Sequence, residues 1–201
     1  MLNRTPFLFI ISAPSGTGKT TLCRELVKAD PGIKYSVSAT TRSRRGKEEH
    51  GKDYLFLTED EFRELERDGG LLEHEEVYGY LYGTPKAHVF EHMDHGYDVI
   101  FDLDIKGALN LKNTQKESVT VFVLPPSISE LHRRLSVRAR DTEEIIADRL
   151  AKAKDEIAKA REFDYVVVND VLNECVKTLS AILAAERSRT KRIKEISIKE
   201  D

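Results

Sequence analysis

The fold of this chain is decided by one stretch near its N-terminus, Phe7-Leu-Phe-Ile-Ile-Ser-Ala-Pro-Ser-Gly-Thr-Gly-Lys-Thr-Thr21. An apolar run typical of a buried β-strand leads into a glycine-rich turn, and a helical pattern follows it. Gly16 and Gly18 allow the backbone to curl so that several N–H groups point inward, and the following helix adds the positive end of its dipole. The stretch therefore predicts a phosphate-binding loop for a nucleotide polyphosphate.

The loop departs from the pattern G-x-x-x-x-G-K-[ST] at one position, because Ala13 stands where the pattern has glycine. Lys19 supplies a point charge for the β- and γ-phosphates, and the Thr20 hydroxyl is placed to bind Mg²⁺. The alternative is a glycine-rich strand-to-helix turn with a chance lysine, but the strand before it and the helix after it favour nucleotide binding. The residues predicted to form the loop are Ala13, Pro14, Ser15, Gly16, Thr17, Gly18, Lys19 and Thr20.

Composition limits the function classes. The 201 residues suit one compact unit, and a hydrophobic content of 40% supports a real core. The net charge of −3 gives no reason to expect nucleic-acid binding. No apolar run approaches the length of a membrane span. Cys23 and Cys175 form no metal-binding spacing, so buried free thiols in a reducing, cytoplasmic environment are expected.

Alternating strand and helix patterns predict an α/β fold, with a parallel sheet flanked by helices and right-handed crossovers. Capping boxes at Thr58-x-x-Glu61 and Ser127-x-x-Glu130 mark two helix starts. The predicted strands are Phe7–Ser12, Tyr35–Ser38, Tyr54–Leu57, Val99–Leu103, Val119–Leu124 and Tyr165–Val168.

Three regions look different from this alternating core. Residues 35–86 are rich in charges and glycines, which predicts an inserted antiparallel subdomain. The arginine-rich segment 131–161 has the pattern of a helical flap, and the charged tail 191–201 is expected to be a solvated end.

A second cluster of phosphate-binding side chains lies between Ser36 and Leu57. It offers Arg42, Arg44 and Arg45 with nearby hydroxyl groups and Tyr54. Arginine forks and phenol hydroxyls suit a second phosphate, although in an arbitrary chain a solvated basic loop would be the more common explanation. Here the phosphate-binding loop already calls for a phosphoryl acceptor.

The spacing of Thr40-Thr41-Arg42, Arg45, Glu48, Gly51 and Tyr54-Leu-Phe-Leu57 resembles the signature of guanylate kinases. The resemblance extends over nearly the whole chain. Its other segments are Ser12–Thr20, Glu73, Tyr82–Thr84, Val99–Gly107, Pro125–Ser127, Arg149–Leu150 and Val168–Asp170.

This resemblance implies a P-loop nucleoside-monophosphate kinase fold in a single domain over residues 1–201. The core would comprise about residues 1–36, 88–128 and 160–201. An insert at about 37–87 would bind GMP, and a helical lid would span about 129–159. The implied reaction transfers the γ-phosphoryl group of Mg-ATP to GMP, with Mg²⁺ as cofactor.

The resemblance also implies roles for individual residues of the acceptor site. It assigns the GMP phosphate to Arg42, Arg45, Tyr54 and Tyr82, and it assigns the guanine to Ser38, Glu73 and Thr84. The chemistry agrees, because guanine presents two donors, N1–H and the N2 amino group, along one edge, and one carboxylate accepts both. Adenine has an acceptor at N1, which a carboxylate repels. Taken alone, Glu73 would more often be a surface acid.

Acids and arginines complete the expected site. Asp102 and Asp104 end an apolar strand, where parallel-sheet ligands bind; Asp102 resembles the acid that holds Mg²⁺ through water, and Asp104 is expected to face GMP. Arg138 and Arg149 match the lid arginines that close over the transferring phosphoryl group, although Val137 and Ala139 replace the family's usual glycines. Asn169 resembles the residue near the adenine of ATP.

Two other functions remain as alternatives at this point. Guanylate-kinase-like modules of scaffold proteins bind peptides without catalysis, but they typically have degraded phosphate loops, whereas Lys19 and Thr20 are intact here. A related kinase could phosphorylate another phosphorylated acceptor such as a ribose bisphosphate. Ser38, Glu73 and Thr84 argue for guanine instead.

Overall fold

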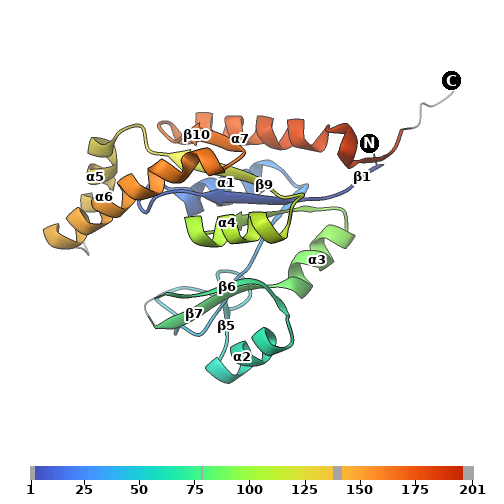
Figure 1. Cartoon of the computed structure of the whole chain (residues 1–201), viewed down its shortest axis with the longest axis horizontal. Helices are drawn as coiled ribbons and strands as arrows, with labels where there is room; N and C mark the ends of the chain where they lie inside the picture. Colours follow the sequence, from blue (N-terminus) through green and yellow to red (C-terminus); the bar gives the residue numbers. More distant parts are fainter. Residues whose placement is uncertain (1–2, 78, 138–141, 197–201) are drawn as a thin grey trace.

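The computed structural model describes residues 3–77, 79–137 and 142–196, and its centre is a parallel sheet (Figure 1). The five strands lie in the order β10-β9-β2-β8-β3. Every neighbouring pair in this sheet is parallel, as the continuous apolar runs predicted. The strands are β2 (Leu8–Ser12), β3 (Ile33–Tyr35), β8 (Asp98–Asp102), β9 (Val119–Leu124) and β10 (Tyr165–Val168).

Helices cover both faces of this sheet. Alternate residues of β2 explain the two layers: Phe9 and Ile11 face one core cluster, whereas Leu8 and Ile10 face the other. The first cluster is closed by α1 (Lys19–Ala29) and α7 (Leu172–Arg187), and the second by α3 (Lys86–Asp94) and α4 (Ile105–Thr114). Figure 1 shows α7 and α4 on opposite sides of the sheet. The predicted α/β architecture is therefore confirmed.

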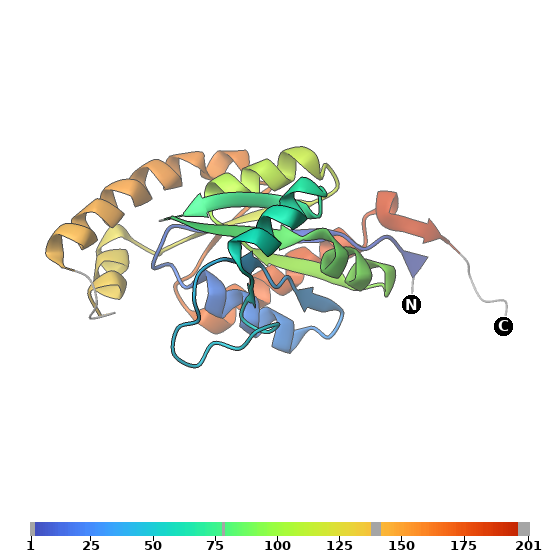
Figure 2. The same ribbon diagram turned by 90° about the horizontal axis from the view of Figure 1, so that it is seen from below.

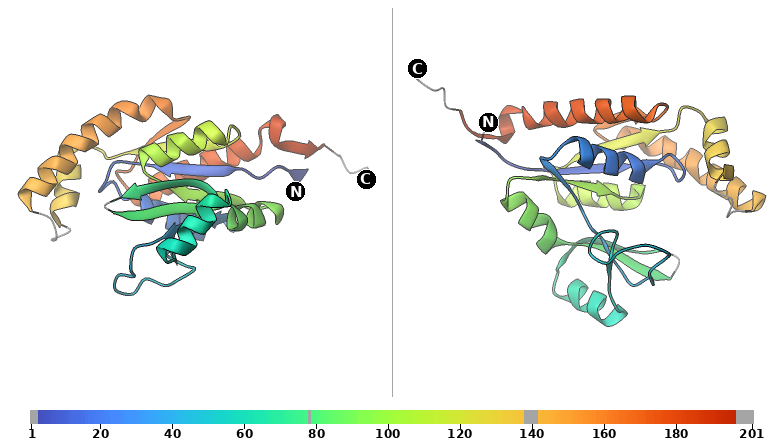
Figure 3. Two further views of the ribbon diagram at one scale, coloured as in Figure 1. Left: turned by 60° about the horizontal axis from the view of Figure 1, so that its bottom comes forward. Right: turned by 180° about the vertical axis from the view of Figure 1, so that it is seen from behind.

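A second, four-stranded sheet lies on the α4 side of the core (Figures 1 and 3). Its order is β5-β4-β7-β6, and it is mixed rather than purely antiparallel as expected, because β4 and β5 run parallel. Phe62 of α2 (Glu59–Arg67) is fully buried in a small core of its own. The strands are β4 (Ala39–Thr40), β5 (Leu55–Phe56), β6 (Leu71–Val77) and β7 (Tyr80–Pro85).

The helices α5 (Ile128–Val137) and α6 (Glu143–Ala158) project from one end of the molecule (Figure 2). Leu131 and Leu135 pack against Ile146 and Ala153 in a separate apolar cluster. The Ser127 hydroxyl accepts a hydrogen bond from the Glu130 backbone N–H, which accounts for the helix start predicted there. Among the described residues no helix is both long and apolar enough to cross a membrane.

The strands predicted at Phe7–Ser12, Tyr54–Leu57 and Val99–Leu103 differ from the observed bounds by one residue at one or both ends. Two other predicted segments are wrong by more than this. The strand expected at Tyr35–Ser38 lies earlier, at Ile33–Tyr35, because the chain leaves the sheet after the Ser36 N–H bonds the Ile100 carbonyl. The tail from Lys191 is not a solvated end over its first residues. A short 3₁₀ turn, η2 (Thr190–Arg192), leads to β11 (Ile193–Glu195), which pairs antiparallel with β1 (Asn3–Arg4).

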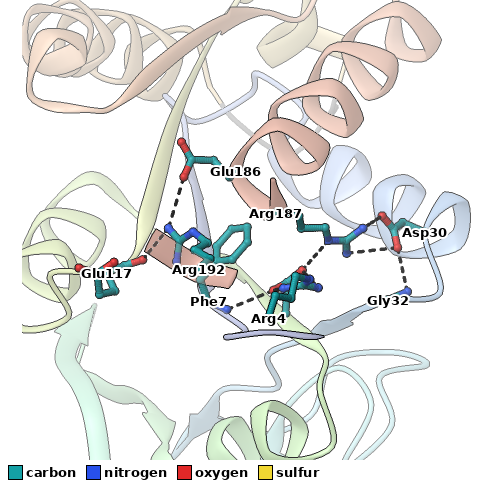
Figure 4. Close-up of polar contacts among 9 residues, drawn as sticks. Arg4, Phe7, Asp30, Gly32, Glu117, Glu186, Arg187 and Arg192 are labelled. Carbon is teal, nitrogen blue, oxygen red and sulfur yellow. Dashed lines mark hydrogen bonds and ion pairs between the residues drawn. The ribbon is translucent and has the colours of Figure 1, made fainter. Parts of the chain in front are cut away.

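Buried charges fix this terminal ribbon to the core (Figure 4). Asp98, at the start of β8, is fully buried and accepts two hydrogen bonds from Arg4, at 2.6 and 2.7 Å, and one from Arg187 Nε at 2.7 Å. Arg187 also contacts Asp30. Arg192 is 3% exposed; its guanidinium lies 4.1 Å from the Phe7 ring centre. The amino end of β8 is thus held by an ion-pair cluster of Arg4, Asp98, Arg187 and Asp30.

Replacing Asp98 should destabilise the fold strongly, because Arg4 and Arg187 would keep their charges without a carboxylate between them. We expect Asp98→Asn to lower the free energy of unfolding by about 3 kcal/mol. Asp94→Asn is the matched control, since Asp94 is exposed. Urea denaturation of both variants measures the difference. Equal stability of the two variants would show that the cluster contributes nothing.

Candidate functional site

The phosphate-binding loop lies at the carboxyl edge of the central sheet, between β2 and α1. Gly16 and Gly18 have φ of +91° and +95°, which side-chain-bearing residues rarely adopt. A Cβ at Gly16 would also meet Leu135 of α5 at 2.8 Å. The amide of Asn169 donates to the Thr17 carbonyl at 2.8 Å, so the loop is supported from β10 as well. Both glycines are therefore required by the loop's shape.

Lys19 and Thr20 converge on one carboxylate. Lys19 Nζ lies 2.6 Å from Asp102 Oδ1 and donates to the Leu103 carbonyl, and the Thr20 hydroxyl donates to Asp102 Oδ2 at 2.5 Å. The pairing of β2 with β8 sets Asp102 opposite Ile11, directly before the loop begins. The structure thus brings together the three residues that the sequence predicted for phosphate and metal binding.

This donor set fits Mg²⁺. The ion prefers oxygen ligands and commonly binds through one or two protein groups together with substrate phosphates and water. Thr20 and Asp102 supply a hydroxyl and a carboxylate in contact beside the loop. No group of three or more His, Cys, Asp or Glu side chains suited to a metal occurs among the described residues.

Of the three residues expected to bind guanine, Ser38 and Glu73 line a cavity of 320 Å³, together with Tyr82 and Asp104. Thr84 is fully buried and does not line it. The Thr84 hydroxyl donates to Glu73 Oε1 at 2.6 Å, leaving Oε2 without a hydrogen bond of its own among the described contacts. Burial raises the pKa of the Glu73 carboxyl, while the Thr84 hydrogen bond opposes the shift. This half-buried acceptor is suited to a ligand that brings its own donors.

Asp104 has two roles that the sequence did not distinguish. Its carboxylate accepts a hydrogen bond from the Gly107 N–H at 2.7 Å and so caps α4. It also lines both the cavity beside Glu73 and the cavity of 310 Å³ formed by the phosphate loop. The cap holds the carboxylate at this edge of the sheet.

The expected second phosphate site is partly assembled. Arg42 is buried, makes two hydrogen bonds to Glu48 at 2.9 and 3.0 Å, and lies 5.3 Å from the centre of the Tyr54 ring. These bonds raise the pKa of Arg42. Tyr82 packs edge-on against Tyr54 at 6.0 Å. Arg45 belongs to the same loop, but its side chain is exposed and lines none of these cavities.

The structure describes one of the two expected lid arginines. Arg149 of α6 lies with Ser15 of the phosphate loop in the wall of a cleft of 700 Å³. Arg138 lies outside the described residues. Glu156, also on α6, faces the loop cavity, and burial raises the pKa of its carboxyl. One face of α6, from Glu144 to Glu156, therefore lies opposite the phosphate loop.

Sequence reasoning missed three supporting residues. Glu48 was recognised only as part of a signature, although its separation from Arg42 by six residues within one loop suggests an ion pair. Arg134 donates to the carbonyls of Thr17 and Asn169, and no sequence signal distinguishes it from other lid arginines. Tyr35 donates to Asp102 from the neighbouring strand. Strand register, which the sequence does not give, decides that contact.

Three adjoining cavities connect these groups. The middle one, of 400 Å³, is lined by Lys19 and Thr20 on one side and by Ser38 and Tyr54 on the other. It shares Lys19 with the loop cavity, and it shares Ser38, Tyr54 and Asp102 with the cavity beside Glu73. The three cavities thus adjoin one another from the phosphate loop to the expected base site.

Comparison with known proteins agrees with this geometry. The sequence model of the guanylate kinase family matches residues 5–186. A guanylate kinase of Ruegeria pomeroyi is 45% identical over 202 residues, which cover 100% of this chain and 94% of that protein. One of Cereibacter sphaeroides is 49% identical over 191 residues, covering 94% and 90%.

A solved structure is similar over the same length. The crystal structure of guanylate kinase from Anaplasma phagocytophilum superposes with a TM-score of 0.78 at 33% identity, and the match covers 96% of this chain and 92% of that one. Family sequence, full-length relatives and three-dimensional fold all agree. The chain belongs to the guanylate kinase family.

Proposed function

We propose that this guanylate kinase transfers the γ-phosphoryl group of Mg-ATP to GMP, giving ADP and GDP, through the site described above. The observation that carries the proposal is the row of three adjoining cavities, with shared lining residues, from the Lys19 loop to Glu73. A donor phosphate bound at one end and an acceptor phosphate near Tyr54 would meet in the middle cavity.

On the donor side, the backbone N–H groups of residues 13–20 would hold the ATP phosphates. Lys19 would move its charge from Asp102 to the β- and γ-phosphates, and Asn169 would lie near the adenine. Thr20 and Asp102 would hold Mg²⁺, directly and through water respectively. The ion would neutralise charge that develops on the transferred group.

On the acceptor side, Arg42, Arg45, Tyr54 and Tyr82 would bind the GMP phosphate. Ser38, Glu73, Thr84 and Asp104 would bind the base and the groups next to it. The Thr84–Glu73 hydrogen bond supports this assignment, because it fixes one carboxylate beside an open cavity. An ionised Glu73 can accept from both N1–H and the N2 amino group of guanine, and dGMP should also fit because these contacts involve the base.

The proposed division into core, insert and lid follows the four apolar clusters, two of which lie in the core. We assign residues 1–36, 88–128 and 160–201 to a core, residues 37–87 to a GMP-binding insert and residues 129–159 to a lid. The separate small cores around Phe62 and around Leu131 support this division. Two free, buried cysteines, Cys23 and Cys175, support a reducing, cytoplasmic location.

No general base is required, because the attacking phosphate oxygen of GMP is already ionised. Catalysis would come from alignment of the two phosphates and from charge stabilisation by Lys19, Arg138 and Arg149. Closure of the lid over the cleft beside Ser15 would exclude water and so suppress ATP hydrolysis.

Lys19→Ala should retain the fold but lose most turnover, because the loop would lack its charge for the transferring phosphate. We expect kcat to fall by about 10²-fold or more. Lys28→Ala is the control on the same helix, since the Lys28 side chain is 70% exposed and pairs with Glu25. Steady-state kinetics with circular dichroism checks both variants. Near-wild-type kcat in folded Lys19→Ala would refute the assignment of the loop.

Glu73→Gln tests the guanine site. The amide can accept only one of the two guanine donors and sets its own NH₂ group against the other, so kcat/KM for GMP should fall by about 10²-fold or more. Glu76→Gln is the control, because Glu76 is exposed on the same strand and does not line the cavity. An unchanged kcat/KM in Glu73→Gln would make Glu73 a surface acid and would misplace the base site.

Arg149→Ala separates binding from chemistry at the lid. If Arg149 meets the phosphoryl group mainly in the closed state, kcat and kcat/KM should fall together, with nucleotide dissociation constants nearly unchanged. Lys154→Ala, on an exposed position of the same helix, is the control. The readout combines kinetics with equilibrium titration of each nucleotide. Intact kcat with weaker ATP binding would instead make Arg149 a ground-state clamp.

A further inference from the structure

Three side chains donate to the Asp102 carboxylate, and they come from two parts of the fold. Lys19 and Thr20 belong to the phosphate loop and the start of α1. The third contact comes from β3, where the Tyr35 hydroxyl donates to Asp102 Oδ2 at 3.3 Å. Within the described chain, Tyr35 is thus the donor to Asp102 that does not belong to the nucleotide-binding segment.

Strand register explains how Tyr35 reaches Asp102. In the parallel pair β3–β8, Tyr35 lies opposite Ile100. Asp102 follows Ile100 by two residues, so both point to the same face of the sheet. An aromatic side chain is long enough to cover that diagonal step. The Tyr35 ring packs against the apolar cluster beneath α1 and α7, which fixes where its hydroxyl lies.

Hydrogen-bond chemistry sets the direction of this contact. The Tyr35 phenol carries one O–H donor and a carboxylate oxygen is an acceptor, so the bond runs from Tyr35 to Asp102. A hydrogen bond from a hydroxyl to a carboxylate is charge-assisted.

Nucleotide binding would affect the three donors to Asp102 in different ways. On the proposed function, on which this inference rests, Lys19 turns to the phosphates and the Thr20 oxygen turns to the metal. Tyr35 does not line the phosphate-loop cavity, and it shares the wall of the middle cavity with Asp102, so its hydroxyl remains beside that carboxylate. We propose that Tyr35 is a positioning residue that holds the Asp102 carboxylate oriented for the water shell of Mg²⁺ and thereby strengthens the metal-dependent part of ATP binding.

The test compares binding of the non-hydrolysable analogue AMP-PNP in excess Mg²⁺ and in EDTA, by calorimetry. Tyr35→Phe removes the hydroxyl and keeps the ring. We expect the ratio of Kd in EDTA to Kd in Mg²⁺ to fall by about five- to tenfold, because one hydrogen bond to a charged group is lost. Kd in EDTA should stay close to that of the unmodified protein.

Tyr165→Phe is the matched control. The Tyr165 hydroxyl also donates to a carboxylate, Glu186 Oε1 at 2.7 Å, but on β10 and α7, and neither residue lines a cavity of the site. The ratio of Kd in EDTA to Kd in Mg²⁺ should not change in Tyr165→Phe. Thermal unfolding of both variants provides the stability comparison. An equal fall of the ratio in the two variants would assign the effect to general loss of stability and overturn the proposal.

Asp102→Asn completes a double-mutant cycle. This variant should lower the ratio by itself, and Tyr35→Phe should then add no further fall, because the two residues act through one carboxylate. An unchanged ratio in Tyr35→Phe, with a lowered one in Asp102→Asn, would overturn the role of Tyr35 alone. An unchanged ratio in Asp102→Asn would refute the proposed metal site, and the role of Tyr35 with it.

Discussion

The pairing of β2 with β8 is the constraint on which the functional edge of the molecule depends. It sets Asp102 opposite Ile11, and the Leu103 N–H bonds the Ile11 carbonyl at 3.2 Å. The loop that starts two residues later then returns Lys19 and Thr20 to the same carboxylate. The carboxyl ends of parallel strands lie at the same edge of a sheet. The acid at the end of β8 and the glycine-rich turn after β2 are therefore neighbours.

Buried charges at the opposite ends of these strands serve the same arrangement. Asp98 begins the strand that Asp102 ends, and Arg4 and Arg187 reach it from the two terminal segments. Such a cluster is costly to desolvate, and Asp98 is its central member, because it is the carboxylate that pairs with both arginines. The phosphate site is thereby held on strands whose far ends are fixed by both ends of the chain.

Much of the fold and the site could be predicted because local chemistry determines them. The sequence of Phe7–Thr21 has the patterns of a strand, a turn and a helix in that order. The strands β9 and β10 were predicted at their observed bounds. By contrast, β6 was not recognised as a strand. Its alternate residues Glu73 and Glu75 face a cavity rather than a core, so the strand lacks the apolar alternation that predicts one.

Contacts set by register or by remote partners could not be predicted. The sequence of Ile193–Glu195 is typical of a charged tail. It forms a strand because it pairs with β1, which lies near the other end of the sequence. The bond from Tyr35 to Asp102 depends on which residues of β3 and β8 are paired. Arg42 was predicted as a phosphate ligand. Its two hydrogen bonds to Glu48, which hold the side chain in place, were not predicted.

Glu73 is proposed to select guanine and the Lys19 loop to deliver the phosphoryl group within one site. A coupled assay of ADP release with ATP and a panel of GMP, dGMP, AMP, CMP and UMP tests both roles together. We expect robust turnover with GMP and dGMP and little with the other three. Comparable turnover with AMP, or ADP release that is independent of any acceptor, would contradict these roles.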